Sequence, residues 1–135
     1  MAYIDLREKS RYLRELTVAG GGKALRPDEI DIAEEYADAV IEGKLGKSWE
    51  SGSVPKLIEH IADLLGSAKA WNFVLVGQLE TDGAFPKRLR DEAFELLKEI
   101  KSGEIGLKLP DGTWDEDFSG TNSEAEDGGG IEILI

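Results

Sequence analysis

The acidic segment that starts at Asp115 has the ligand spacing of a calcium-binding loop. Oxygen-bearing side chains fall at positions 1, 3, 5, 7, 9 and 12 of an EF-hand loop, and a glycine stands at position 6. These residues are Asp115, Asp117, Ser119, Gly120, Thr121, Ser123 and Glu126. An EF-hand also needs a helix on each side, but Pro110 and Gly112 predict a turn before the loop, and residues 128–130 are all glycine. We therefore interpret the segment as an acidic linker and predict no metal site.

Two glycine-lysine sequences suggest phosphate binding at first sight. Gly46-Lys47-Ser48 could end a phosphate-binding loop, but that loop needs a glycine five residues before Gly46, where Ile41 stands. It also needs a preceding strand, where the pattern predicts a helix. The run of residues 20–23 is followed by Ala24 instead of serine or threonine. We predict no nucleotide site at either place.

The chain has one histidine, His60, and no cysteine, so a thiolate nucleophile is excluded. A general base needs a nucleophile or a substrate within hydrogen-bond reach, and no serine or threonine lies three or four residues from His60. Carboxylates recur between residues 28 and 42 at helical spacing, which is typical of a solvated helix face: Asp28, Asp31, Glu34, Glu35, Asp38 and Glu42. We predict no catalytic residue and no cofactor, and hence a protein that is not an enzyme.

Length and charge limit the possible partners. The chain has 135 residues, enough for about one domain, and a net charge of −12. Such a charge argues against unspecific nucleic-acid binding, which depends on neutralising phosphates, and against docking on an anionic membrane. The most apolar run, Trp71 to Val76, is too short to span a bilayer.

The charge divides the chain into two parts. Residues 110–135 contain eight acidic residues and no basic one. We predict a body over residues 1–109 and an acidic, glycine-rich tail over residues 110–135, with about 115–130 disordered in the isolated chain. The tail ends in apolar, mostly β-branched residues that suggest docking on a partner, or a strand packed on its own domain: Ile131, Ile133, Leu134 and Ile135.

The body reads as four helices. Apolar residues at helical spacing, with prolines at helix starts and glycines after helix ends, predict helices over about 5–16, 27–45, 55–75 and 86–102. Asp5 is the expected N-cap of the first helix, and Gly103 is expected to follow the last. The third helix is apolar on a wide face and is expected to be central. Residues 107–114 predict a short strand and a tight turn or hairpin. The predicted class is all-α: a small four-helix domain with a short β turn or hairpin and an extended acidic C-terminal tail.

Aromatic and basic residues supply the candidate partner contacts. Trp71 lies on an apolar helix face and is predicted to be core. Trp49 and Trp114 lie in a loop and a turn, where each either contacts a partner or caps the end of the bundle. Arg88 and Arg90, near the start of the fourth helix, are candidate contacts for an acidic surface, including the acidic tail of a neighbouring copy.

Four stretches together resemble a known protein family. They are a short opening helix from Tyr3, the segment Leu25-Arg26-Pro27-Asp28-Glu29-Ile30 with its helix, the helix from Pro55 to Ala62, and the closing stretch Phe94 to Leu107. Over about residues 3–109 this pattern resembles the head–tail connector, or head-completion adaptor, proteins of tailed phages and prophages, including the Mu-like prophage group.

The resemblance implies a structural role in the virion, at the head–tail interface, after assembly in the host cytoplasm. Such adaptors form a ring, generally twelvefold, beneath the portal protein. They extend the DNA channel without binding the DNA specifically, and they offer a platform for the neck or tail completion proteins. An alternative suggested by the acidic composition alone is a small interaction or regulatory protein, such as a DNA mimic.

Overall fold

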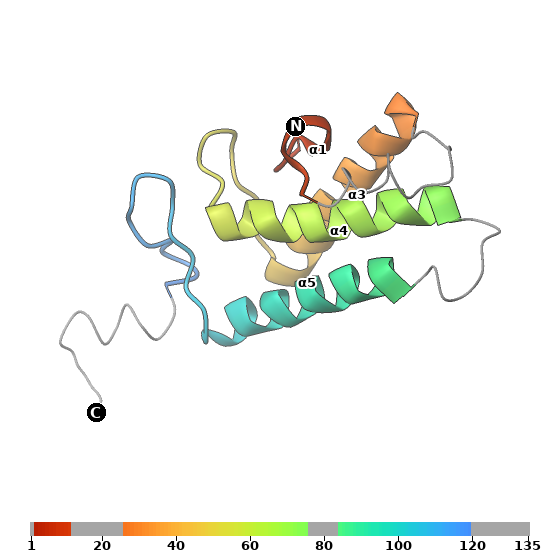
Figure 1. The fold of residues 1–135 in the computed structure, drawn as a ribbon. Coiled ribbons are helices and arrows are strands. Elements are labelled where there is room, and N and C mark those ends of the chain that lie inside the picture. Colours follow the sequence, from red (N-terminus) through yellow and green to blue (C-terminus); the bar gives the residue numbers. More distant parts are fainter. Residues whose placement is uncertain (1, 12–25, 76–83, 120–135) are drawn as a thin grey trace.

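The structure, a computed structural model, describes residues 2–11, 26–75 and 84–119. These residues form the α-helices α1 (Leu6–Lys9), α3 (Pro27–Leu45), α4 (Lys56–Leu75) and α5 (Ala84–Ser102). The described residues contain one isolated antiparallel bridge, between Lys108 and Trp114. They contain no β-strand of more than one residue. Figure 1 shows the three long helices packed together, with the short α1 against them. The predicted all-α class is confirmed.

Helix α4 is the centre of the core, as its wide apolar face predicted. It packs against α3 and α5, and α1 contacts it as well. Its side chains are therefore buried almost all round, including Ile58, Ile61, Leu64, Leu65 and Ala68. Trp71 is buried too, as predicted. Pro55 directly precedes the helix, which begins at Lys56.

Helix α3 begins and ends where its sequence signals predicted. Pro27 occupies the first turn, where a missing backbone N–H costs nothing. The backbone N–H of Arg26 donates to Glu29 Oε1 at 3.0 Å, which closes half of a capping box. Ala33, Ala37 and Ile41 are fully buried along one side. The small side chains of Ala33 and Ala37 let α4 pack closely on this side of α3.

Helix α5 begins two residues before the predicted start at Pro86. Leu89, Ala93, Leu97 and Ile100 are buried at helical spacing, as expected. The helix ends at Ser102, and Gly103 follows with φ of 88°, a conformation that glycine adopts without strain.

The first helix is much shorter than predicted. Asp5 is its N-cap, as expected, and accepts a hydrogen bond from the backbone N–H of Arg7 at 3.1 Å. The helix ends at Lys9, however, because Ser10 is extended (φ −66°, ψ 134°). The hydroxyl of Ser10 donates to the buried Asp63 Oδ1 at 2.6 Å, and the N–H of Arg11 donates to Asp63 Oδ2 at 3.0 Å. The remainder of the predicted helix, residues 12–16, lies outside the described residues.

The turn after α5 is formed as predicted, but the order extends further than expected. The N–H of Leu109 donates to the Thr113 carbonyl at 2.8 Å, which closes the turn. We expected disorder to begin at about residue 115. Instead, Asp115 is 1% exposed, and the N–H of Leu107 donates to the Phe118 carbonyl at 2.6 Å. The expectation is therefore wrong for residues 115–119, because long-range hydrogen bonds order them; residues 120–130 lie outside the described part of the chain.

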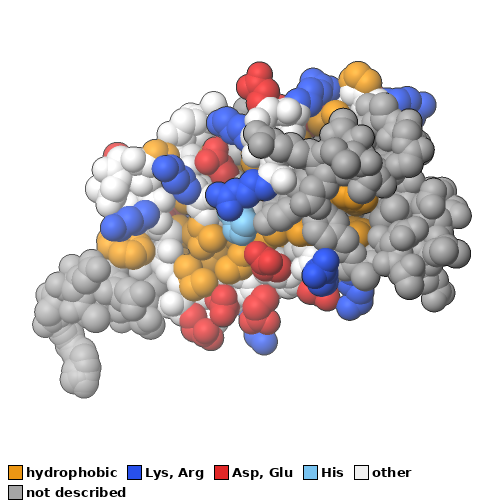
Figure 2. Space-filling view, in the orientation of Figure 1, with side chains coloured by type: hydrophobic (Ala, Val, Ile, Leu, Met, Phe, Trp, Pro, Cys, Tyr) orange, Lys and Arg blue, Asp and Glu red, His pale blue; other side chains and the backbone are white. Residues whose placement is uncertain are grey.

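Charged side chains are spread over the face of the molecule drawn in Figure 2. Within the described residues, no helix is both long enough and apolar enough to cross a membrane.

Candidate interaction surface

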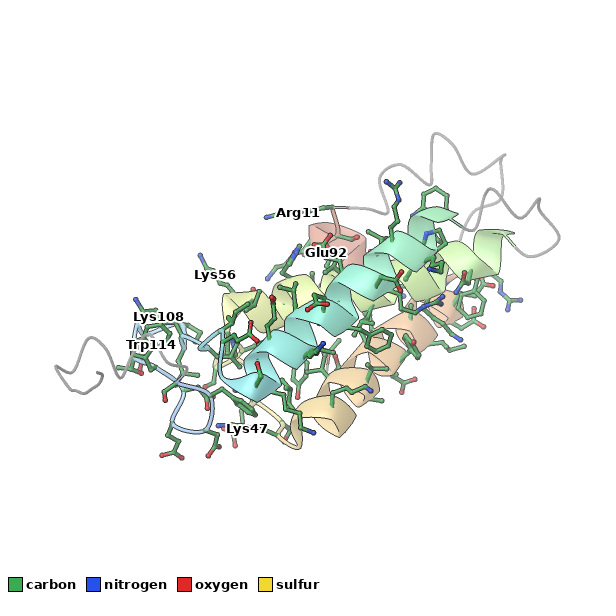
Figure 3. The ribbon with its side chains drawn as sticks, turned by 90° about the horizontal axis from the view of Figure 1, so that it is seen from below. Arg11, Lys47, Lys56, Glu92, Lys108 and Trp114 are labelled. Carbon is green, nitrogen blue, oxygen red and sulfur yellow. The ribbon has the colours of Figure 1, made fainter. Side chains whose placement is uncertain are left out.

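Two segments that are far apart in the sequence meet at one end of the bundle. The loop between α3 and α4 and the segment after α5 lie side by side there (Figure 1), and Lys47, Lys108 and Trp114 are grouped at this end (Figure 3). We call Lys47, Trp49, Trp114 and Asp115 the tryptophan cluster. It contains both tryptophans that the sequence offered as partner contacts.

Asp115 holds the tryptophan cluster together. One carboxylate oxygen accepts from Lys47 Nζ at 2.9 Å and from the backbone N–H of Asp117 at 2.9 Å. The other accepts from the Trp49 indole Nε1–H at 2.9 Å. Burial acts to raise the pKa of Asp115, but the hydrogen bonds from Lys47 and Trp49 outweigh it, so the pKa lies below its ordinary value. The carboxylate is therefore ionised and serves to join the two segments.

Lys47 pairs with two acidic residues of this segment, Asp115 and Asp117. Its ammonium lies 2.9 Å from Asp115 Oδ1 and 2.8 Å from Asp117 Oδ2. Burial acts to lower the pKa of Lys47, but these two hydrogen bonds raise it above its ordinary value. The glycine-lysine sequence set aside as a phosphate loop thus has a structural role within the chain.

Trp49 caps the end of the bundle, which is one of its two predicted roles. Its side chain is 7% exposed, and its ring lies edge-on to Tyr3 with the ring centroids 6.0 Å apart. The Phe118 ring lies on it at 6.3 Å. Because so little of the indole reaches the surface of the single chain, the burial favours the capping role, and a partner contact at Trp49 stays a prediction.

Trp114 is half-buried and remains a candidate contact. Lys108 Nζ lies 5.1 Å from the centre of its ring, within the range of a cation–π interaction. A hollow of about 300 Å³ borders it, lined in part by Ser48, Leu109 and Glu116. Gly106 lies so close behind the ring that a Cβ atom there would approach Trp114 Cζ3 to 2.7 Å and meet the Ser119 carbonyl.

The other candidate contacts do not join this surface. Arg88 is exposed and Arg90 is half-buried, and both lie in the first turns of α5. Arg88 is roughly 20 Å along the helix from its C-terminal end, at 1.5 Å per residue. The structure therefore does not bring the two arginines together with Trp114. The apolar terminal residues Ile131, Ile133, Leu134 and Ile135 lie outside the described residues.

His60 bridges two helices, which its local sequence did not predict. It is half-exposed, as expected, and its Nε2 lies 3.4 Å from Glu92 Oε2 of α5. Helical spacing within α4 carried no information about a partner on α5. The pair links the two helices on the face drawn in Figure 2, where the single histidine is pale blue.

A buried polar cluster was missed altogether. Asp63 and Ser67 are buried one turn apart in α4, and the Ser67 hydroxyl donates to Asp63 Oδ1 at 2.8 Å. The hydroxyl oxygens of Ser10 and Ser67 are 2.9 Å apart. One feature of the sequence could have indicated this cluster: Asp63 and Ser67 are polar residues four positions apart in an otherwise apolar stretch of the helix. The cluster fixes the end of α1 on α4.

The carboxylates of α3 fix the N-terminal segment, although the sequence predicted a merely solvated face. Glu34 accepts from the N–H of Leu6 at 2.9 Å, Asp38 from the N–H of Tyr3 at 3.2 Å, and Glu42 from the Tyr3 hydroxyl at 2.6 Å. Burial raises the pKa of Asp38 to about 6. Burial and the hydrogen bond to Glu42 also raise the pKa of the Tyr3 hydroxyl.

The described residues can be searched for a metal site. The structure's described residues contain no group of three histidine or carboxylate side chains placed to hold a metal ion. Of the predicted EF-hand spacing only residues 115–119 are described, and the carboxylate of Asp115 is already engaged by Lys47 and Trp49.

Comparisons with models of known protein families, with curated proteins and with solved structures gave no significant match. Function must therefore be argued from the chain's own residues.

Proposed function

We propose that this chain is a structural adaptor of the head–tail connector class. Copies of it form a ring beneath a portal protein, extend the DNA channel and carry the next neck or tail protein. The proposal begins from the family resemblance of residues 3–109. In this reading, the chain works by presenting surfaces, and its acidic character keeps it from binding DNA tightly.

One observation carries the proposal. Apolar residues of the resembling stretches lie in the core. Ala33 and Ile41 of the second matching stretch, Ile58 of the third, and Ile100 and Leu107 of the fourth are all fully or almost fully buried. A pattern carried by core positions reflects how the helices pack, whereas a pattern of surface residues would be easier to meet by chance.

The described body fits a DNA mimic less well. A mimic presents free carboxylates at the spacing of phosphates. The most regular row of carboxylates in the body runs along α3, and Glu34, Asp38 and Glu42 of that row accept hydrogen bonds from the chain's own N-terminal segment. These groups already have internal partners, so we rank the connector first.

The genes that flank this one give the most direct test. Reading frames sized for a portal and a major capsid protein on one side, with tail genes on the other, would support the proposal. A chromosomal setting without structural phage genes would contradict it and favour the DNA mimic.

A second test uses the protein directly. The purified chain is mixed with portal rings made from the neighbouring reading frame and imaged by electron cryomicroscopy. We expect a ring of added density on the tail-facing end of the portal. Portal rings that stay bare at saturating protein would overturn the proposal.

A further inference from the structure

One edge of the bundle carries cations that have no acidic partner. Lys9, Arg11, Lys56 and Lys108 are exposed, and among the described residues none of them lies within ion-pair distance of a carboxylate. Figure 3 shows Arg11, Lys56 and Lys108 along the same side of the molecule. We call these four residues the basic edge. Cations without an ion pair to a described carboxylate, gathered on one side, are unexpected in a chain with a net charge of −12, although Asp5 and Glu59 border the same hollow as Lys9 and Lys56.

The neighbouring flank of α5 is mainly acidic, although Arg88, four residues before Glu92, lies on the same side of the helix. Glu92, Glu95 and Glu99 recur at spacings of three and four residues, so they share one side of the helix. Glu92 lies on the His60 side of the molecule, because its carboxylate is paired with His60. Within the described residues, no ion pair engages Glu95 or Glu99. We call these three residues the acidic edge.

Apolar surface separates the two edges. Leu57 of α4 and Leu96 of α5 are half-buried against the core, and Leu96 lies between Glu92 and Glu99 on the flank of α5. In the left half of the face in Figure 2, hydrophobic side chains lie between basic side chains above and acidic side chains below, while charges of both signs are mixed at the top and at the lower right. This order of charges is that of an interface with an apolar centre and a polar rim.

We infer that the basic edge of one copy contacts the acidic edge of a second copy. Charge complementarity between the edges identifies the partner, because each copy supplies both signs and the remaining net charge would otherwise make copies repel. A contact between unlike edges leaves one free edge of each kind on the resulting pair. Further copies therefore add in the same way, and the assembly closes into a ring if the rotation per copy allows. The closure into a ring rests on the proposed function, but the pairwise contact does not.

Cross-linking tests the contact directly. A zero-length carbodiimide couples lysine amines to carboxylates that touch them. The full chain is prepared in normal and ¹⁵N-labelled form, mixed and cross-linked, so that mixed-isotope peptides report only contacts between copies. We expect such peptides to join Lys56 or Lys108 to Glu95 or Glu99. Their absence would overturn the inference, as would lysine links that go instead to Glu124 or Glu126, which would identify the acidic tail as the occupant.

Charge reversal separates this contact from a general loss of folding. Lys56→Glu with Lys108→Glu leaves the basic edge with two cations and two carboxylates and so removes its net charge. Glu95→Lys with Glu99→Lys leaves the acidic edge with two cations and one carboxylate and so makes it net basic. We expect each double variant alone to self-associate about tenfold or more weakly than the natural chain in sedimentation velocity at low salt. An equimolar mixture of the two variants is expected to associate again, because it restores one edge of each sign. A mixture that stays monomeric, while both variants keep the natural helical circular dichroism, would contradict the contact.

Matched controls carry the same change of charge elsewhere. Lys44→Glu with Lys101→Glu alters exposed residues of α3 and of the opposite flank of α5, and Glu35→Lys with Glu50→Lys alters exposed residues of α3 and the following loop. These variants should associate like the natural chain. If the controls weaken association equally, net charge and not the edges is responsible. Either failure leaves the connector proposal to be decided by the flanking genes and the portal experiment.

Discussion

Replacing Asp115 with alanine is expected to lower the free energy of unfolding by about 3 kcal/mol. The carboxylate is 1% exposed and joins two segments through Lys47 and the Trp49 indole. Its loss leaves the buried indole N–H without an acceptor, which costs about 1–3 kcal/mol. Breaking a fully buried ion pair costs about 3–5 kcal/mol. The Lys47 side chain is 24% exposed and still pairs with Asp117 in the variant, so the expected loss of unfolding free energy lies near the lower end of that range.

Urea unfolding followed by far-ultraviolet circular dichroism measures this loss without depending on tryptophan fluorescence. Asp117→Ala is the matched control, because it removes the other carboxylate from the same ammonium while its own side chain is 60% exposed. We expect that control to cost less than about 1 kcal/mol. If Asp115→Ala is no more destabilising than Asp117→Ala, the carboxylate does not hold the two segments together.

The same group predicts a dependence on pH. The pKa of Asp115 is lower in the folded chain than its ordinary value. Its contribution is therefore complete above the unfolded pKa of about 3.9 and is lost as the pH falls through the lower folded-state pKa. Asp115→Asn keeps an acceptor for Trp49 but removes the charge. The stability difference between this variant and the natural chain should shrink in strong acid, and a difference that grows there would refute the assignment.

Three further changes probe other parts of the structure. Asp38→Asn should stabilise the fold by about 1 kcal/mol at about pH 7.5 in urea unfolding. Burial raises the folded-state pKa of Asp38 to about 6, so the natural chain loses stability as the pH rises from about 4 through 6. The gain of the variant should therefore vanish near about pH 4. Gly106→Ala should lower the free energy of unfolding by at least about 1 kcal/mol, because a Cβ atom there has no room. Gly43→Ala is the control in thermal unfolding: its Cβ would lie in open space on α3, so it should be neutral or stabilise the chain by up to about 1 kcal/mol. Ser67→Ala should cost about 1–3 kcal/mol by removing a buried partner of Asp63, and should speed hydrogen exchange at the N–H of residue 11.

Each of these changes has an outcome that would contradict its reasoning. A destabilised Asp38→Asn chain at neutral pH would mean that the charge itself holds the N-terminal segment. Equal effects of Gly106→Ala and Gly43→Ala would mean that the segment after α5 is loosely packed. Unchanged exchange in the Ser67 variant would mean that Asp63 holds the end of α1 without the second hydroxyl.

Local sequence signals located the three long helices well. Pro27, Pro55 and Gly103 mark helix ends by removing a donor or by adopting a left-handed backbone, and these effects act within one turn. The apolar period likewise identified α4 as the central helix. The end of α1 was misplaced because Ser10 is extended and hydrogen-bonded to Asp63, a residue 53 positions away. No local pattern reports such a distant partner.

The candidate surface was only partly predictable. Trp49 and Trp114 were recognised as aromatic residues outside the helices, which their positions next to glycine and proline turns made clear. The burial of Trp49 involves a hydrogen bond to Asp115, which is 66 residues away and which the sequence assigned to a disordered linker. An aspartate in a strongly acidic segment is expected to be exposed to solvent. Only the contact with a buried donor, here the Trp49 indole, shows that Asp115 is buried.

The sequence by itself determined an acidic, all-α chain whose helices begin and end at prolines and glycines, because propensity, capping and amphipathic period act over a few neighbouring residues. Only the tertiary structure decided that Trp49 is buried, that the carboxylates of α3 hold the N-terminal segment, and that charges of opposite sign lie on separate edges. Those features depend on which side chains meet across the bundle. That meeting is set by how the helices pack, and packing joins residues that the chain separates by dozens of positions.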